Sequence, residues 1–140
     1  MEDLFSLSGL LSLTGWAALL ASPIIPKLSQ WIAAIIIPAL LSVIYAALVL
    51  AYWTRASGGF GSLADVLLLF QTPQILLAGW IHYLAFDLFV GAWIVRAARS
   101  DAMPFVFVIP LLPITFLFGP AGFIAFSLVR AARGTLQPSP

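Results

Sequence analysis

The sequence predicts an all-α integral membrane protein in which four transmembrane helices form one bundle and the fourth is kinked or broken at prolines. Composition is the first observation: 8% of the 140 residues are charged, whereas a soluble globular domain carries about 25%. The second is a set of four runs without Asp, Glu, Lys or Arg, at residues 4–26, 28–54, 66–86 and 102–129. Each run is long enough for a helix that crosses the bilayer core, which needs about 20 residues.

The first helix is predicted at 4–21. We expect the mature protein to retain it, because two acidic residues stand where a signal peptide would be basic. The segment SPIIPK, residues 22–27, ends this helix, since proline cannot continue helical hydrogen bonding without cost. The second helix is predicted from 29 or 31 to 53, with a bend at Pro38 that neighbouring helices make tolerable.

The glycine-rich stretch 54–65 is predicted to be the main loop, and 63–70 to lie along the membrane interface. The third helix is expected to begin near Pro73, a favourable first-turn residue, and to end near Arg96. The last segment, 104–130, has prolines at 110, 113 and 120 in addition to the one at which it starts, so a kinked or broken helix is expected there.

The four helices are assigned to a single domain, residues 1–133, and the tail 134–140 is expected to be disordered. With four crossings, each side of the membrane receives three basic residues: Lys27, Arg96 and Arg99 on one side, and Arg55, Arg130 and Arg133 on the other. The positive-inside rule therefore assigns no orientation. The pairs Arg96/Arg99 and Arg130/Arg133 are expected at solvated helix ends near anionic head groups.

The stretch GWIHYLAFDLFVGAW, residues 79–93, places the only histidine and an aspartate inside the third helix. A charged side chain at mid-helix costs about 2.5–3.5 kcal/mol on insertion scales, so such groups usually face the bundle interior or a wet cavity. His82 and Asp87 are five residues apart and therefore about 140° apart around the helix. They cannot chelate one metal by themselves, but a flat ligand in a cleft beside the helix would meet one from each flank.

Two interpretations of this pair remain open. Intramembrane polar groups can simply tie helices together, for roughly 0.6–2 kcal/mol. Alternatively His82 and Asp87 are catalytic, and their neighbours bind the substrate. The predicted substrate-binding residues are Gly79, Trp80, Tyr83 and Phe86.

Several chemistries are excluded by residues that the chain lacks. With no cysteine there is no disulfide and no thiolate metal site, and one histidine is too few for a membrane di-iron site. No G-x-S-x-G motif is present, and a net charge of +1 gives no case for nucleic-acid binding. No metal or cofactor is expected. General acid–base chemistry remains, as do binding without chemistry and transport of a proton or ion.

The stretch WIHYLAFDLFVG, residues 80–91, resembles the W-I-H-x-L-x-x-D-L-F-x-x stretch of the abscisic acid-deficient-4-like family, membrane proteins associated with neoxanthin synthesis in plants. FGPAGFIAF, residues 118–126, looks like that family's C-P-V-G-I segment, with Gly119 in place of the cysteine. The opening LFSLSGLLSLTGW, residues 4–16, is similar to the family's L-F-S start.

This resemblance implies a small membrane protein that acts on carotenoids or supports chemistry on them. The implied reaction is a redox-neutral isomerisation in which an epoxide opens and a proton leaves a neighbouring carbon, with Asp87 as acid and His82 as base or the reverse. The expected partners are membrane lipid and a carotenoid-like apolar substrate, and a homodimer is left open because four helices enclose little volume. The short chain without a transit-peptide-like segment is expected in a bacterial inner membrane. A non-catalytic carotenoid-binding or accessory protein and a small proton-coupled transporter remain the alternatives.

Overall fold

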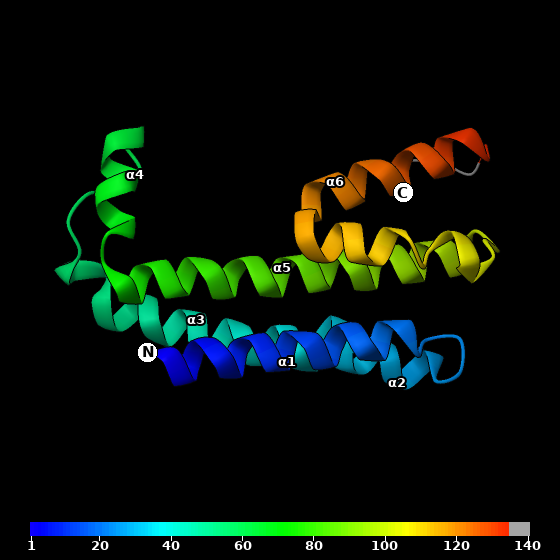
Figure 1. Cartoon of the computed structure of the whole chain (residues 1–140), viewed down its shortest axis with the longest axis horizontal. Helices are drawn as coiled ribbons and strands as arrows, with labels where there is room; N and C mark the ends of the chain where they lie inside the picture. Colours follow the sequence, from blue (N-terminus) through cyan, green and yellow to red (C-terminus); the bar gives the residue numbers. More distant parts are fainter. Residues whose placement is uncertain (135–140) are drawn as a thin grey trace.

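The computed structural model describes residues 1–134, so most of the predicted tail lies outside the described residues. The elements in chain order are α1 Glu2–Leu20, α2 Pro26–Gln30, η1 Trp31–Ile36, α3 Ile37–Tyr52, η2 Trp53–Arg55, α4 Leu63–Phe70, α5 Pro73–Ser100, η3 Phe105–Phe107 and α6 Leu111–Ala132 (Figure 1). There is no strand among residues 1–134. Four helical segments are long and apolar enough to cross a membrane, namely Glu2–Leu20, Pro26–Arg55, Pro73–Ser100 and Leu111–Ala132. The predicted all-α membrane class and the four apolar helices are confirmed.

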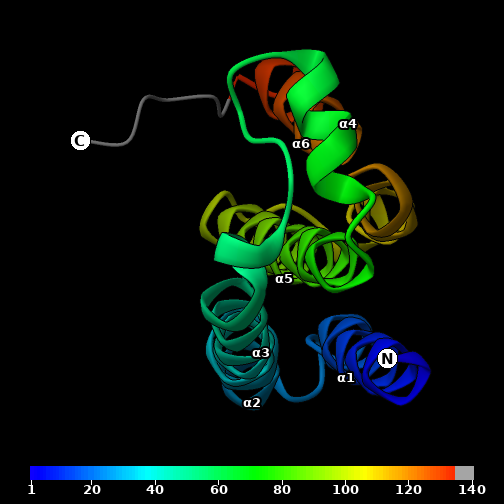
Figure 2. The same ribbon diagram turned by 90° about the vertical axis from the view of Figure 1, so that its left-hand side faces the viewer.

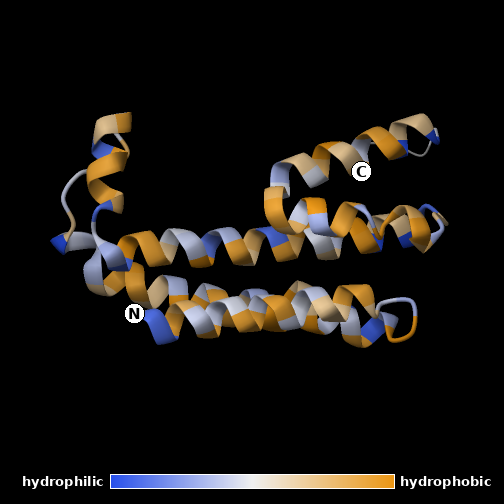
Figure 3. Ribbon diagram, viewed as in Figure 1, coloured by the Kyte–Doolittle hydropathy of each residue, from blue (hydrophilic) through white to orange (hydrophobic). Residues whose placement is uncertain are grey.

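The helix α5 is the centre of the fold. Its 28 residues extend about 42 Å, which exceeds a hydrocarbon core of about 30 Å. The helices α1 and α3 pack along one side of it, and α6 lies on another side (Figures 1 and 2). Apolar residues cover most of the length of these helices, while hydrophilic residues gather at the two ends of the bundle and also form bands in the middle of α5 (Figure 3). This distribution is that of a membrane-embedded bundle.

The helices α1 and α5 approach closely because glycines face large side chains. A Cβ atom at Gly91 would lie 2.7 Å from the ring of Trp16, which is buried. Gly15 faces Leu88 in the same way, and Leu88 is fully buried. Small residues at the crossing therefore set the distance between these two helices.

The segment Pro26–Arg55 is one continuous apolar rod that contains an irregular turn. Pro38 has no N–H and cannot donate to the carbonyl of Ala34. The chain has a π-helical stretch, Trp31–Ile36, which ends two residues before this proline. The wider turn is a recognised way to accommodate a missing helical hydrogen bond.

The helix α4 runs roughly perpendicular to α5 at one end of the bundle (Figure 1). Its first turn is capped, because the Asp65 N–H donates to Ser62 Oγ at 3.1 Å and Ser62 Oγ donates to Asp65 Oδ2 at 2.8 Å. The apolar residues Leu63 and Leu67 are exposed. The orientation and the exposed leucines are those of a helix that lies in the plane of the membrane.

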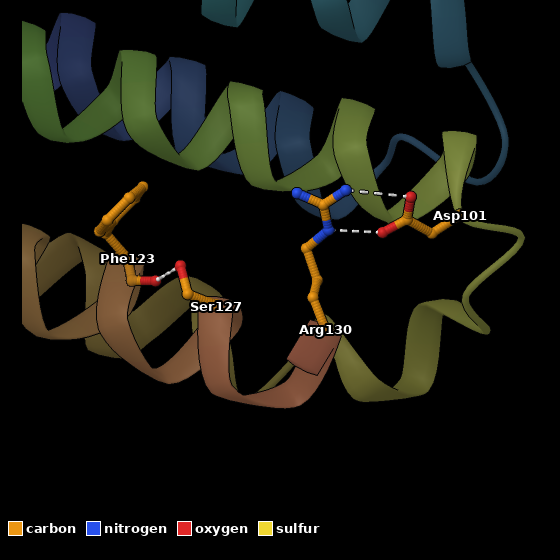
Figure 4. Close-up of polar contacts among 4 residues, drawn as sticks. All are labelled: Asp101, Phe123, Ser127 and Arg130. Atoms are coloured by element: carbon orange, nitrogen blue, oxygen red, sulfur yellow. Dashed lines mark hydrogen bonds and ion pairs between the residues drawn. The ribbon is translucent and has the colours of Figure 1, made fainter. Parts of the chain in front are cut away.

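The helix α6 is interrupted at Phe118, whose φ of −145° and ψ of 59° are not helical. Figure 1 shows the ribbon turning back at this point, so that α6 has two antiparallel halves. Near its end, Arg130 Nε lies 2.6 Å from Asp101 Oδ2, in the loop that precedes α6 (Figure 4). A straight helix of 22 residues would place its ends about 33 Å apart. Because α6 instead turns back on itself, both of its ends lie at the same end of α5 (Figure 1).

Candidate functional site

A cavity of about 300 Å³ lies where α5 meets α3 and α4. Four aromatic side chains contribute to its wall, and α5 contributes a glycine and the histidine. These residues are Tyr45, Trp53, Phe60, Phe70, Gly79 and His82. The rest of the lining is aliphatic, so the imidazole is one of few polar groups that a ligand would meet.

His82 is exposed and is held by aromatic contacts. Its ring stacks on Phe86 at 4.6 Å between centroids, and the Tyr45 ring lies 5.8 Å away. Within residues 1–134 neither ring nitrogen of His82 has a hydrogen-bond partner, and neither does the Tyr45 hydroxyl. Because a neutral imidazole offers one donor and one acceptor, both positions are available to a ligand.

Gly79 makes room for α4. A Cβ atom there would lie 2.7 Å from the Phe70 ring, which closes one wall of the cavity. The close neighbour of this glycine is thus a side chain from the preceding helix. The prediction that Gly79 lets a ligand approach stays a prediction.

Asp87 faces the break in α6 and not the cavity beside His82. It is 7% exposed, and its Oδ2 has no hydrogen-bond partner within the described part of the chain. A Cβ atom at Gly119 would overlap the Asp87 carboxyl group, which shows how closely the two residues pack. Because Gly119 begins the second half of α6, the positive end of that half-helix points at Asp87.

Tyr83 holds the other side of the break. Its hydroxyl donates to the carbonyl of Leu117 at 2.7 Å and lies 3.2 Å from that of Phe116. The Phe116 carbonyl would normally accept from the residue four positions later, but that residue is Pro120, which has no N–H. Tyr83 and Asp87 are four residues apart and share one face of α5. Tyr83 therefore donates to backbone carbonyls before the interruption, and Asp87 packs against the residue after it.

Trp80 and Phe86 lie in two further places. The Trp80 ring stacks on Tyr83 at 5.3 Å and on Phe5 at 5.7 Å, and it lines a separate cavity of about 390 Å³ near the start of α1. Phe86 lines a recess of about 180 Å³ beside Pro38, in addition to its contact with His82. The predicted site residues thus fall into three groups: Gly79, His82 and Phe86; Tyr83 and Asp87; and Trp80.

Sequence reasoning did not single out Tyr45, Phe60 or Phe70, which share the cavity with His82. Tyr45 carried a weak signal, because it is a polar-tipped residue in the middle of an apolar run. Phe60 and Phe70 carried none, since only the folding of α4 against α5 brings them there. Among residues 1–134, no group of three or more His, Cys, Asp or Glu side chains is placed to hold a metal ion.

Comparison with known proteins identifies the family. The comparison with curated proteins and the comparison with solved structures each found no match. The family model described as ABA DEFICIENT 4-like matches residues 3–126, which include all but the first residue of α1, the whole of α5 and the break in α6. The family predicted from the sequence is thereby confirmed, and the chain belongs to the ABA4-like family.

Proposed function

We propose that the chain is a membrane enzyme of carotenoid or isoprenoid metabolism that carries out isomerase-type acid–base chemistry with His82 and Asp87. Membership of the ABA4-like family supports a role in carotenoid-related processes. The observation that carries the proposal is the position of His82, an imidazole without a hydrogen-bond partner in residues 1–134, beside an aromatic cavity within a membrane helix. A bacterial inner membrane is proposed as its compartment, which fractionation of the source cells would test.

The size of the cavity restricts the substrate. At about 300 Å³ it is at the small end of ligand pockets. It suits the six-membered end ring of a carotenoid, or of another isoprenoid, while the polyene chain extends into the surrounding lipid. Tyr45, Trp53 and Phe70 would pack on the faces and methyl groups of this ring.

The proposed step opens a 5,6-epoxide with loss of a proton from C7. The C6–O bond breaks, and the oxygen keeps the electron pair, takes a proton from the acid and becomes a tertiary alcohol at C5. The base takes the C7 proton, and the C7–H electron pair forms the C6=C7 double bond beside C7=C8, which gives an allene. One proton is added and one is removed, so the reaction needs no oxidant or reductant.

We assign His82 as the base, because it lines the cavity, and Asp87 as the acid, because its Oδ2 is buried without a partner in the described residues. The reverse assignment, with His82 as the acid and Asp87 as the base, also adds one proton and removes one. The epoxide oxygen and the C7 hydrogen lie beside one another in the substrate, whereas the two groups face different sides of α5. The proposal therefore requires the Asp87 carboxyl group to turn from Gly119 toward the cavity beside His82 when the substrate binds. Substitutions at the two positions test each role separately.

The test uses purified protein in lipid with an epoxy-carotenoid. The parent should form a product of unchanged mass with a shifted absorption spectrum. His82→Ala and Asp87→Asn should each lower the rate by about 100-fold or more, the usual contribution of a general acid or base. Ser127→Ala is the control, because that hydroxyl donates only to the Phe123 carbonyl of its own helix (Figure 4). Conversion at the parental rate by either variant would refute the role assigned to that residue, and by both would refute the assignment as a whole.

Two observations favour other functions. The separation of His82 from Asp87 favours a carotenoid-binding or accessory protein, because binding needs the cavity but no acid–base pair. In that case pigment would co-purify unchanged, and the parent would convert no substrate. The interrupted helix with a buried aspartate favours a proton-coupled transporter, since broken helices line transport sites. Flux into vesicles that depends on pH and is lost in Asp87→Asn would support the transporter.

A further inference from the structure

A groove of about 350 Å³ runs along α5 at the end of the bundle where α2 begins. Two basic residues, Lys27 and Arg96, line it together with Gln30. Its remaining wall is largely apolar and includes Trp31, Ile35 and Phe89. The groove thus combines positive charge with a surface that suits an acyl chain.

Arg96 is held in position within this groove. Its Nη1 donates to Gln30 Oε1 at 3.0 Å, and Gln30 Nε2 donates to the Ala92 carbonyl at 3.4 Å. The guanidinium carbon lies 6.0 Å from the centre of the Phe89 ring. An ordered guanidinium group loses less side-chain freedom when it binds an anion.

No acidic side chain in the described residues balances the charge of the groove. Asp101 is the acid at this end of the bundle, and Arg130 engages it through two hydrogen bonds. Between residues 1 and 134 this is the one ion pair, so Lys27 and Arg96 have no carboxylate partner there. Positive charge at the edge of a membrane helix favours anionic lipid head groups.

We propose that the groove binds one anionic phospholipid. The phosphate would lie between Lys27 and Arg96, and an acyl chain would extend over Trp31, Ile35 and Phe89. We commit to a lipid over a free anion because the apolar wall continues from the charged end and Trp31 is 59% exposed. This lipid site is independent of the proposed catalytic function.

The test is native mass spectrometry of the purified protein titrated with phosphatidylglycerol or phosphatidylcholine. The parent should bind phosphatidylglycerol more tightly, and Lys27→Gln/Arg96→Gln should bind it about thirtyfold more weakly, since each basic side chain contributes about fivefold at an anionic surface. Arg55→Gln, at the other end of the bundle, is the matched control and should bind as the parent does. If the double variant does not fold, Lys27→Gln alone should show the loss of about fivefold.

Equal binding of the two lipids by the parent would overturn the proposal, as would parental binding by the folded double variant. Inorganic phosphate forms the third arm. If phosphate alone displaces phosphatidylglycerol at similar concentrations, the groove binds a free anion and the lipid proposal fails.

A different observation, the return of α6, carries a second inference. Both ends of α6 lie at the same end of α5 (Figures 1 and 4). Five basic side chains therefore gather at this end of the bundle: Lys27, Arg96, Arg99, Arg130 and Arg133. The basic side chain at the opposite end is Arg55. We infer that the chain crosses the membrane three times, that α6 enters and leaves on one side, and that this basic side faces the cytoplasm.

Cysteine labelling tests this orientation, because the chain has no cysteine of its own. Single variants Ser57→Cys, Ser100→Cys and Ala132→Cys all place the thiol at an exposed position. In bacterial spheroplasts a membrane-impermeant maleimide should label Ser57→Cys, and it should label the other two only after permeabilisation. Labelling of Ala132→Cys together with Ser57→Cys from outside would show four crossings. Labelling of Ser100→Cys from outside, with Ser57→Cys protected, would reverse the orientation.

Discussion

Replacing Tyr83 by phenylalanine tests how the break in α6 is held. The substitution keeps the ring, which stacks on Trp80, and removes the hydroxyl that serves the Phe116 and Leu117 carbonyls. The usual helical donor to the Phe116 carbonyl is missing, because Pro120 has no N–H to donate. The substitution therefore removes a donor that the backbone four residues later cannot replace at Phe116.

The expected loss follows from this hydrogen bonding. A buried hydrogen bond contributes about 0.5–1.5 kcal/mol net, and leaving a buried partner unsatisfied costs about 1–3 kcal/mol. Interhelical hydrogen bonds in membranes average about 0.6 kcal/mol and reach about 1.7 kcal/mol. Since one hydroxyl hydrogen is shared between two carbonyls, we expect Tyr83→Phe to lower the free energy of unfolding by about 1–2 kcal/mol.

The assay is reversible unfolding in mixed micelles with increasing denaturing detergent. Tyr45→Phe is the matched control, because the Tyr45 hydroxyl has no hydrogen-bond partner in residues 1–134, and its free energy of unfolding should stay within about 0.5 kcal/mol of the parent. Equal stability of Tyr83→Phe and the parent would show that this hydroxyl does not hold the break. Equal loss in both variants would show an effect of phenol removal in general.

Three further predictions use the same unfolding assay. Gly91→Ala should lower the free energy of unfolding by about 1–3 kcal/mol, because its Cβ would press on the buried Trp16 ring. The control Gly9→Ala, with open space around it, should not lower it. Equal effects of the two substitutions would argue against close packing of α1 on α5. Asp101→Asn should lower the free energy of unfolding by about 1–2 kcal/mol, because it removes the charge that holds Arg130. The control Asp3→Asn should have little effect. Parental stability of the Asp101→Asn protein would mean that the ion pair does not hold the end of α6 in place. His82→Ala should stay within about 0.5 kcal/mol of the parent, since His82 is exposed and has no hydrogen-bond partner within residues 1–134. A large loss there would indicate a structural role for the imidazole.

The apolar helices were predictable because charge-free runs are a direct consequence of the bilayer. The observed α1, Glu2–Leu20, and α5, Pro73–Ser100, begin within a few residues of the predicted bounds. The helix α4, Leu63–Phe70, coincides with the segment predicted to lie along the interface. In each case local composition or a proline determines where the helix begins.

The orientation could not be predicted, because it depends on the direction in which the chain leaves Phe118. Prolines in a sequence do not specify whether a helix bends or reverses. The prediction of four crossings placed Arg130 and Arg133 at the end of the bundle opposite Arg96, and it therefore gave the two sides of the membrane equal numbers of basic residues. The contact between Arg130 and Asp101 is a tertiary interaction that brings both arginines to the same end as Arg96.

The candidate site was predictable only in part. Helical spacing alone places His82 and Asp87 on different faces of α5, and the two side chains accordingly have different neighbours. The cavity beside His82 also needs Tyr45 from α3 and Phe70 from α4, which helical periodicity within one segment cannot bring together. Likewise, the role of Tyr83 as a donor depends on carbonyls that are distant in the chain, those of Phe116 and Leu117.

The proposed function depends most directly on an isoprenoid end ring occupying the cavity beside His82. The measurement that tests this is the amount of pigment bound per protein after purification from a carotenoid-producing host. Val49→Trp would fill the cavity, whereas Val43→Trp adds the same bulk on the same helix at a position that is 68% exposed. We predict bound pigment or its product in the parent and in Val43→Trp, and none in Val49→Trp. Equal pigment in all three proteins, or none in the parent, would contradict occupation of this cavity.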